Sequence, residues 1–149
     1  METTKMTGDT KTPVLTLVSE SGNRRVLEEW LRDHDRYRLV GSDAEIRNAD
    51  FECCLLDSEM LFDHREALLE RDATEASILP YLLLVPEANH RAVRDRLRTE
   101  HPDLWEAVDG LIDMPVSKTR LAEQLETFLR LRSQSITVDQ QREQLDVLN

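Results

Sequence analysis

The chain of 149 residues contains few of the residues that several classes of protein require. The chain has only four glycines, and none of the glycine-rich motifs that hold nucleotide phosphates occurs. The two cysteines, Cys53 and Cys54, are adjacent and indicate neither a disulfide framework nor a zinc site. No apolar run is long enough to span a bilayer, and the N-terminus lacks the pattern of a signal peptide. We therefore expect a cytoplasmic protein without a membrane segment.

Basic residues are also scarce. There are 19 Lys and Arg against 30 Asp and Glu, which gives a formal net charge of -11. Direct binding to nucleic acid requires clustered positive charge, so this balance argues against it. The four histidines lie at positions 34, 64, 90 and 101, without the spacing of metal ligands. No residue pattern indicates an enzyme.

Apolar runs alternate with amphipathic stretches along most of the chain. Five strands are predicted, at about residues 14–18, 37–40, 51–56, 78–85 and 110–113. Helices are expected at about 23–32, 60–71, 88–99 and 117–131, with a very short one inside 43–50 and a helical turn from Pro102. This alternation is typical of an α/β fold with a parallel sheet. The flavodoxin-like strand order 2-1-3-4-5 fits five strands and makes the first and third neighbours.

Residues 51–57 form the stretch around which the chain is organised. An apolar run there ends abruptly on Asp57, at the carboxyl end of a predicted strand, where ligands and chemistry concentrate in open α/β sheets. The predicted strand order places Glu20 beside Asp57. Two interpretations are open: Asp57 is a phosphate acceptor or metal ligand, or it simply caps the next helix.

Four short stretches carry a resemblance to a known family. They are LVSE at residues 17–20, LLDSEM at 55–60, PYLLLV at 80–85 and MP at 114–115. Together they resemble the receiver domain of response regulators, across about residues 13–131. In that family an acidic pair after the first strand binds magnesium, and an Asp after the third strand is phosphorylated. A Ser or Thr after the fourth strand and a Lys before the Pro after the fifth contact the phosphoryl group.

Only part of that site is present in this sequence. The resemblance implies that Asp57 is the phosphoacceptor and that Glu20, Asp57 and the backbone carbonyl of Glu59 are the candidate ligands of a magnesium ion. The remaining positions of the site differ from the family pattern: Ser19 replaces the second acid, Val85 the hydroxyl residue and Met114 the lysine. Phosphoryl transfer relies on positioned cations and donors, and two of those groups are missing.

A degenerate, pseudo-receiver site is therefore expected, in a module that signals by protein–protein contact and requires no cofactor. The alternative is a genuine magnesium-dependent phosphoacceptor that uses Asp57. An enzyme or cofactor binder on a flavodoxin-like scaffold is permitted by the fold but recommended by no residue.

The last part of the chain predicts a helix that continues beyond the sheet. We divide the chain into a tail at 1–12, a receiver-like domain at 13–131 and a C-terminal linker or signalling helix at 132–149. Leu131, Val138 and Leu145 repeat every seven residues, although Gln134 and Gln141 interrupt the seam. Such a helix indicates a protein partner, either a sensor kinase or downstream signalling domain or a second copy of the chain; a frayed tail is the other interpretation.

The residues from Met114 to Lys118, the run LRLR at 129–132 and the run QREQL at 141–145 carry a narrower resemblance. They are similar to receiver-like input domains of haloarchaeal sensor kinases and of bacterio-opsin-activator-type regulators. In those proteins the last helix continues into further modules.

Overall fold

The core of the structure is a parallel sheet. The computed structural model describes residues 11–19, 21–41 and 45–148, with side chains to residue 142. Within these residues the strands are β1 (Thr12–Leu17), β2 (Tyr37–Val40), β3 (Cys53–Asp57), β4 (Tyr81–Pro86) and β5 (Gly110–Met114). They lie in the order β2-β1-β3-β4-β5, and every neighbouring pair is parallel. The predicted flavodoxin-like topology is confirmed.

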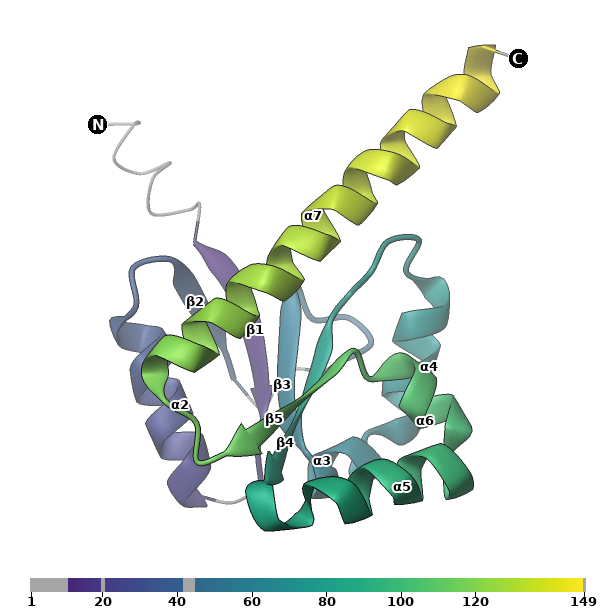
Figure 1. Cartoon of the computed structure of the whole chain (residues 1–149). Coiled ribbons are helices and arrows are strands. Elements are labelled where there is room, and N and C mark those ends of the chain that lie inside the picture. Colours follow the sequence, from purple (N-terminus) through teal and green to yellow (C-terminus); the bar gives the residue numbers. More distant parts are fainter. Residues whose placement is uncertain (1–10, 20, 42–44, 149) are drawn as a thin grey trace.

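Helices cover both faces of this sheet (Figure 1). The described helices are α2 (Ser21–Asp33), α3 (Ser58–Asp63), α4 (Arg65–Thr74), α5 (His90–Glu100), α6 (Pro102–Ala107) and α7 (Lys118–Leu148), with a 3₁₀ turn η1 (Glu87–Asn89) before α5. Leu27 of α2 and Leu125 of α7 belong to the core on one face. Leu61 of α3, Leu68 of α4, Leu97 of α5 and Leu104 of α6 belong to the core on the other. The domain thus has three layers.

The central strand β3 is buried on both faces, as its continuous apolar run predicts. Each residue from Cys53 to Leu56 has no solvent exposure. Cys53 packs in the core beneath α2 and α7, whereas Cys54 packs in the core of the opposite face. Burial raises the pKa of both thiols, most of all by removing them from water, so they remain neutral core side chains.

Some strand boundaries and one apolar position differ from what the sequence suggests. The first strand begins at Thr12, whose amide donates to the Arg36 carbonyl at 2.9 Å, so Thr12 is not part of the tail. The fourth strand begins at Tyr81 rather than residue 78, because Pro80 has no N–H to join the ladder. In α2 the predicted apolar position Val26 is 59% exposed, and Leu27 and Leu31 form the buried stripe instead.

The single helix expected at 60–71 is two helices. His64 separates α3 from α4 with φ of -106° and ψ of 19°, outside the helical region, and its amide donates to the Met60 carbonyl at 3.0 Å. Leu61 and Leu68 lie on either side of this break and are both fully buried. The two short helices therefore cover the same face of the sheet, and the apolar spacing did not reveal the interruption.

The expected short helix within residues 43–50 is absent from the described part of that segment. Residues 46–48 form a turn, in which the amides of Asn48 and Ala49 both donate to the Glu45 carbonyl. Residues 42–44 lie outside the described residues. Ile46, the one strong apolar anchor expected here, is buried.

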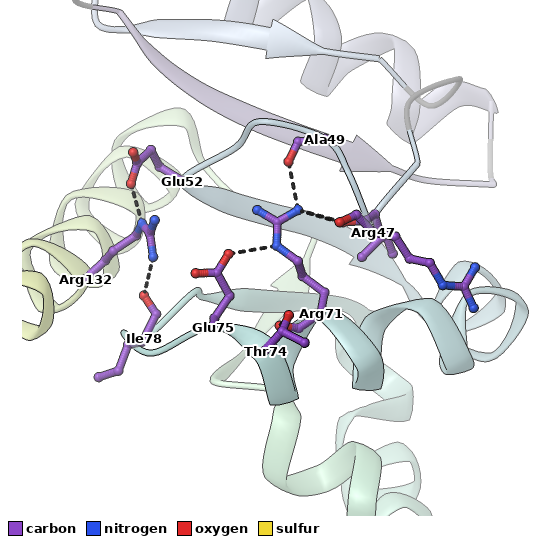
Figure 2. A network of polar contacts seen from close by, with 9 residues as sticks. Arg47, Ala49, Glu52, Arg71, Thr74, Glu75, Ile78 and Arg132 are labelled. Carbon is purple, nitrogen blue, oxygen red and sulfur yellow. Dashed lines mark hydrogen bonds and ion pairs between the residues drawn. The ribbon is translucent and has the colours of Figure 1, made fainter. Parts of the chain in front are cut away.

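Arg71 of α4 supplies the partners that a helix would have given this turn (Figure 2). Its Nη1 donates to the carbonyls of Ile46 and Ala49, each at 2.8 Å. Its Nε donates to Glu75 at 2.8 Å, and its guanidinium lies 4.8 Å from the centroid of the Phe51 ring. One side chain thus satisfies carbonyls that the irregular segment leaves without backbone partners.

The first half of α7 covers the sheet with an apolar stripe. Leu121 and Leu125 are buried, and the ring of Phe128 packs on β5 at Gly110. A Cβ at that glycine would lie only 2.8 Å from the Phe128 Cζ atom, so the close approach of the ring depends on the absence of a side chain. Leu131, farther along the helix, is 41% exposed.

The second half of α7 projects past the sheet (Figure 1), but it is anchored where it leaves. Arg132 pairs with Glu52 and donates from Nη1 to the Ile78 carbonyl at 3.0 Å, as Figure 2 shows. The Ile78 amide donates to Ser135 Oγ at 2.9 Å, and Ser77 Oγ donates to Asp139 at 2.6 Å. The segment is helical and projects, as predicted, and polar contacts hold its first turns because the sheet-facing side of the helix turns polar at Arg132.

The Arg71 contacts give a first testable prediction. Replacing Arg71 by Met keeps an unbranched stem but leaves the Ile46 and Ala49 carbonyls without their donor. The free energy of unfolding should fall by roughly 1.5–3 kcal/mol, the usual cost of removing a charged hydrogen-bond partner. Chemical denaturation monitored by circular dichroism measures it.

Arg91→Met is the matched control for this variant. Arg91 is exposed on α5, so its replacement should change stability by no more than about 0.5 kcal/mol. Equal stability of the two variants would show that Arg71 does not hold the 46–49 turn.

Candidate functional site

The carboxyl ends of the strands meet at one edge of the sheet, where Asp57 is the last residue of β3. The parallel pairing of β1 with β3 aligns Leu17 with Leu56, which brings Ser19 to Asp57. On the other side, β3 pairs with β4 in a register that places Asp57 opposite Leu84. The Asp57 side chain is half-buried at this edge.

Both carboxylate oxygens of Asp57 accept hydrogen bonds from the protein. Oδ2 accepts from the backbone N of Ser19 at 2.8 Å and from the hydroxyl of Ser19 at 2.7 Å. Oδ1 accepts from the backbone N of Met60 at 3.0 Å. The Met60 contact makes Asp57 the N-cap of α3, with the extended backbone typical of that position. This geometry is that of a helix cap, which is the second of the two interpretations of Asp57.

Ser19 changes the electrostatics of this edge. A carboxylate at position 19 would repel Asp57, and a cation would be needed between the two negative charges. A serine instead donates two hydrogen bonds to the same oxygen. The Asp57 carboxylate is thus stabilised by neutral donors of the chain itself.

The other predicted site residues lie in different surroundings. Glu20 lies outside the described residues, so its predicted position beside Asp57 stays a prediction. Glu59 is exposed in the first turn of α3. Val85 has no exposure and packs in the core shared with α3 to α6. Met114 is half-buried and packs against the opposite core, with a cis peptide bond to Pro115.

The described residues do not form a magnesium site. No group of three or more His, Cys, Asp or Glu side chains among them could hold a metal ion. Magnesium requires near-octahedral oxygen coordination, and Asp57 already accepts three hydrogen bonds. Glu20, the remaining predicted side-chain ligand, lies outside the described residues, so magnesium binding at Asp57 stays a prediction.

A cavity of about 350 Å³ opens at this edge. Asp57, Ser58 and Glu59 line one side of it, and Leu84, Val93 and Met114 contribute apolar surface. The structure therefore brings Asp57, Glu59 and Met114 to one cavity but leaves Val85 out of it.

The sequence patterns missed a polar pair beside this cavity. His90 Nδ1, at the start of α5, contacts Asp113 Oδ1 of β5 at hydrogen-bond distance. Both side chains are partly exposed. Twenty-three positions separate them, so no local spacing signals the pair; only the pairing of β4 with β5 brings them together.

The residues predicted to bind a partner through the last helix are exposed where the structure describes them. The side chain of Leu131 is 41% exposed and that of Val138 is 48% exposed. Ile78, from the connection before β4, is 43% exposed and lines the same groove as Leu131 and Val138. We refer to Ile78, Leu131 and Val138 as the α7 patch. The side chain of Leu145 lies outside the described part of the chain.

Solved structures resemble this fold over most of its length. A CheY-like response regulator receiver domain protein from Methanospirillum hungatei covers 83% of this chain and 98% of its own, with 16% identity and a TM-score of 0.62. The non-phosphorylated receiver domain of HemR from Leptospira biflexa covers 80% of this chain and 94% of its own, with 23% identity and a TM-score of 0.56.

A structure of an adenylate cyclase from Rhodopirellula baltica is also similar, with 12% identity and a TM-score of 0.64. It covers 91% of this chain and 98% of its own. No family model and no curated protein matches the sequence. The chain thus has the fold of CheY-like receiver domains. None of its described helices is both long and apolar enough to cross a membrane.

The contacts of Asp57 give a second prediction. Asp57→Ala removes the cap of α3 and leaves three donors without an acceptor, so the free energy of unfolding should fall by roughly 1–3 kcal/mol. Asp35→Ala, at an exposed turn, should stay within about 0.5 kcal/mol of the parent. Urea denaturation of both variants tests this, and an Asp57→Ala variant as stable as the parent would contradict a structural function of the carboxylate.

Proposed function

We propose that the chain is a receiver-like signalling module that acts through protein–protein contact and does not require phosphorylation. The observation that carries this proposal is the engagement of Asp57, whose two oxygens accept from Ser19 and Met60. A phosphoryl group on Asp57 would displace these donors. The acyl phosphate would carry about 1.5–2 negative charges in place of the single charge of the carboxylate, and no lysine would offset them, because position 114 is a methionine.

The missing switch groups support the same proposal. Val85 stands where a hydroxyl would have to reach the phosphoryl group, but its side chain is a hydrocarbon and is fully buried in the core. Met114 brings a thioether, which is only a weak hydrogen-bond acceptor, to the cavity. Neither residue can stabilise charge on phosphoryl oxygens.

The output surface in this proposal is the α7 patch. Arg132, Ser135 and Asp139 anchor one side of α7 to the domain, and they leave Leu131 and Val138 exposed to a partner. Ile78 belongs to the patch, and its own backbone carbonyl accepts the hydrogen bond from Arg132. A partner bound to this patch would therefore contact both α7 and the connection before β4. Its binding would influence the anchor contacts, and the anchor contacts would influence its binding.

The partner we propose is a sensor kinase, a downstream signalling domain or a second copy of the chain. In longer regulators that this sequence resembles, among them the haloarchaeal sensor kinases and bacterio-opsin-activator-type proteins, the last helix leads into the next module. Pairing of two copies through the α7 patch is the form of this proposal that can be tested with the chain alone.

One observation favours a second candidate, a phosphoacceptor that uses Asp57 and magnesium. Asp57 is half-buried but lines an open cavity, so an incoming phosphoryl donor could reach it. In this candidate Glu20 and the backbone carbonyl of Glu59 would complete the metal site, and Ser19 would have to release Oδ2.

Beryllofluoride separates the two candidates. With magnesium present, it should leave the amide NMR signals around Asp57 and Val85 unchanged, because the carboxylate is already occupied and no lysine offsets the added charge. Asp57→Asn under the same conditions is the control. Saturable shifts in the parent chain that disappear in Asp57→Asn would overturn the proposal in favour of the phosphoacceptor.

Self-association tests the output surface. We expect sedimentation velocity to show concentration-dependent dimers of the full chain, weak because the patch is small. Leu131→Glu combined with Val138→Glu should leave only monomers, since two buried carboxylates would face each other across the pair.

The matched control carries the same charge change on the opposite side of the helix. Ser133→Glu combined with Gln140→Glu alters two exposed positions and should dimerise like the parent. Dimers that survive the patch variant, or a parent chain that stays monomeric at all concentrations, would contradict pairing through the α7 patch.

A further inference from the structure

Apolar, acidic and neutral polar side chains line the cavity beside Asp57. Val18, Leu84, Val93 and Met114 contribute apolar surface from β1, β4, α5 and β5. Asp57 and Glu59 place two carboxylates on the side formed by the start of α3. Its volume of about 350 Å³ is within the range of small-molecule sites, roughly 300–1,000 Å³.

None of the described residues that line this cavity is a lysine, an arginine or a histidine. His90, which directly follows the lining residue Asn89, is paired with Asp113. An anion would therefore meet two carboxylates without a compensating charge, in a protein whose formal net charge is -11. A cation would be attracted by the same two carboxylates.

The apolar walls distinguish between kinds of cation. Asn23, Ser58 and Asn89 also line the cavity, but most of its exposed lining is apolar, whereas a metal ion requires several oxygen ligands at once. The apolar side chains can bury a hydrocarbon group and remove its surface from water. The complementary ligand has one positive end and an apolar body.

The Asp57 carboxylate can accept from such a ligand without losing its present bonds. Two carboxylate oxygens offer about four lone-pair positions, and Ser19 and Met60 occupy three. Glu59 is exposed at the mouth of the cavity and can turn toward the ligand.

From these observations we propose that the cavity binds an organic ammonium ion with an apolar stem. The ammonium group lies against Asp57 and Glu59, and the stem packs between Leu84, Val93 and Met114. A free amine and the lysine side chain of a protein share this chemistry. The proposal is independent of dimerisation through the α7 patch, which lies at the opposite ends of the strands.

NMR titration of the full chain, labelled with ¹³C at the methionine methyls and with ¹⁵N, tests the site directly. The ligands are 2-phenylethylamine, phenylacetate and 2-phenylethanol, which share an aromatic stem but differ in charge. The amine should shift the Met114 methyl and the Val93 amide saturably, and phenylacetate should bind roughly tenfold more weakly or not at all. Phenylacetate binding as tightly as the amine, or no saturable shift with any amine, would overturn the proposal.

A second arm identifies the source of the ammonium group. Nα-acetyl-lysine amide carries the same ammonium on a lysine side chain. Shifts of Met114 and Val93 with this compound but not with 2-phenylethylamine would support a lysine of a protein partner. Shifts with 2-phenylethylamine alone would support a free amine.

Substitution at Met114 provides the matched variants. Met114→Lys places an ammonium group inside the cavity, so amine binding at the Val93 amide should weaken at least roughly tenfold. Met114→Leu keeps an apolar wall and should bind like the parent. Unchanged amine binding by a folded Met114→Lys variant would count against the site.

Glu59→Gln keeps the test decisive if Met114→Lys does not fold. It removes one charge from an exposed position, so it should weaken 2-phenylethylamine binding and leave 2-phenylethanol binding unaltered. An equal effect on both ligands would show that charge does not contribute to recognition.

Discussion

The carboxylate of Asp57 joins three segments at the edge where chemistry would be expected in this fold. It ends β3, caps α3 through the Met60 amide and holds the segment after β1 through two bonds from Ser19. These bonds cross from one parallel strand to its neighbour, at the point where strand order reverses. The Asp57 carboxylate is thus part of the hydrogen-bonding framework at this edge.

The second feature that matters for the proposed function is the helix α7. One side of this helix changes from apolar to polar along its length, from Leu121 and Leu125 to Arg132, Ser135 and Asp139. The change coincides with the end of the sheet, so the helix remains attached after the apolar core stops. A neighbouring side of the same helix leaves Leu131 and Val138 in water. The helix is therefore attached to the domain along one side and exposes apolar side chains along another.

The sheet could be predicted from the sequence because its strands are short, continuous apolar runs separated by amphipathic stretches. A strand that is buried on both faces can be recognised from its own continuous apolar run. For this reason β3 and β4 could be predicted from the sequence alone. The strand order followed from topological rules rather than from any residue. The capping position of Asp57 was also available, because an Asp between a strand and a helix is a common N-cap.

The features that escaped prediction depend on contacts between residues far apart in the chain. Arg71 replaces a helix by reaching carbonyls 22 and 25 positions away, and no local pattern announces it. The same holds for Arg132 with Ile78 and for His90 with Asp113. For Arg132, Ser135 and Asp139 a signal did exist: they continue the helical spacing of Leu121, Leu125 and Phe128. A search restricted to apolar residues passes over it.

Hydrogen exchange at the Ser19 amide tests the central claim most directly. If Ser19 donates to Asp57 without help from a metal, this amide should exchange far more slowly than in an unstructured peptide of the same sequence. Its protection should be the same with and without magnesium. Rapid exchange, or protection that develops only when magnesium is added, would show that the carboxylate is free for a metal and a phosphoryl group.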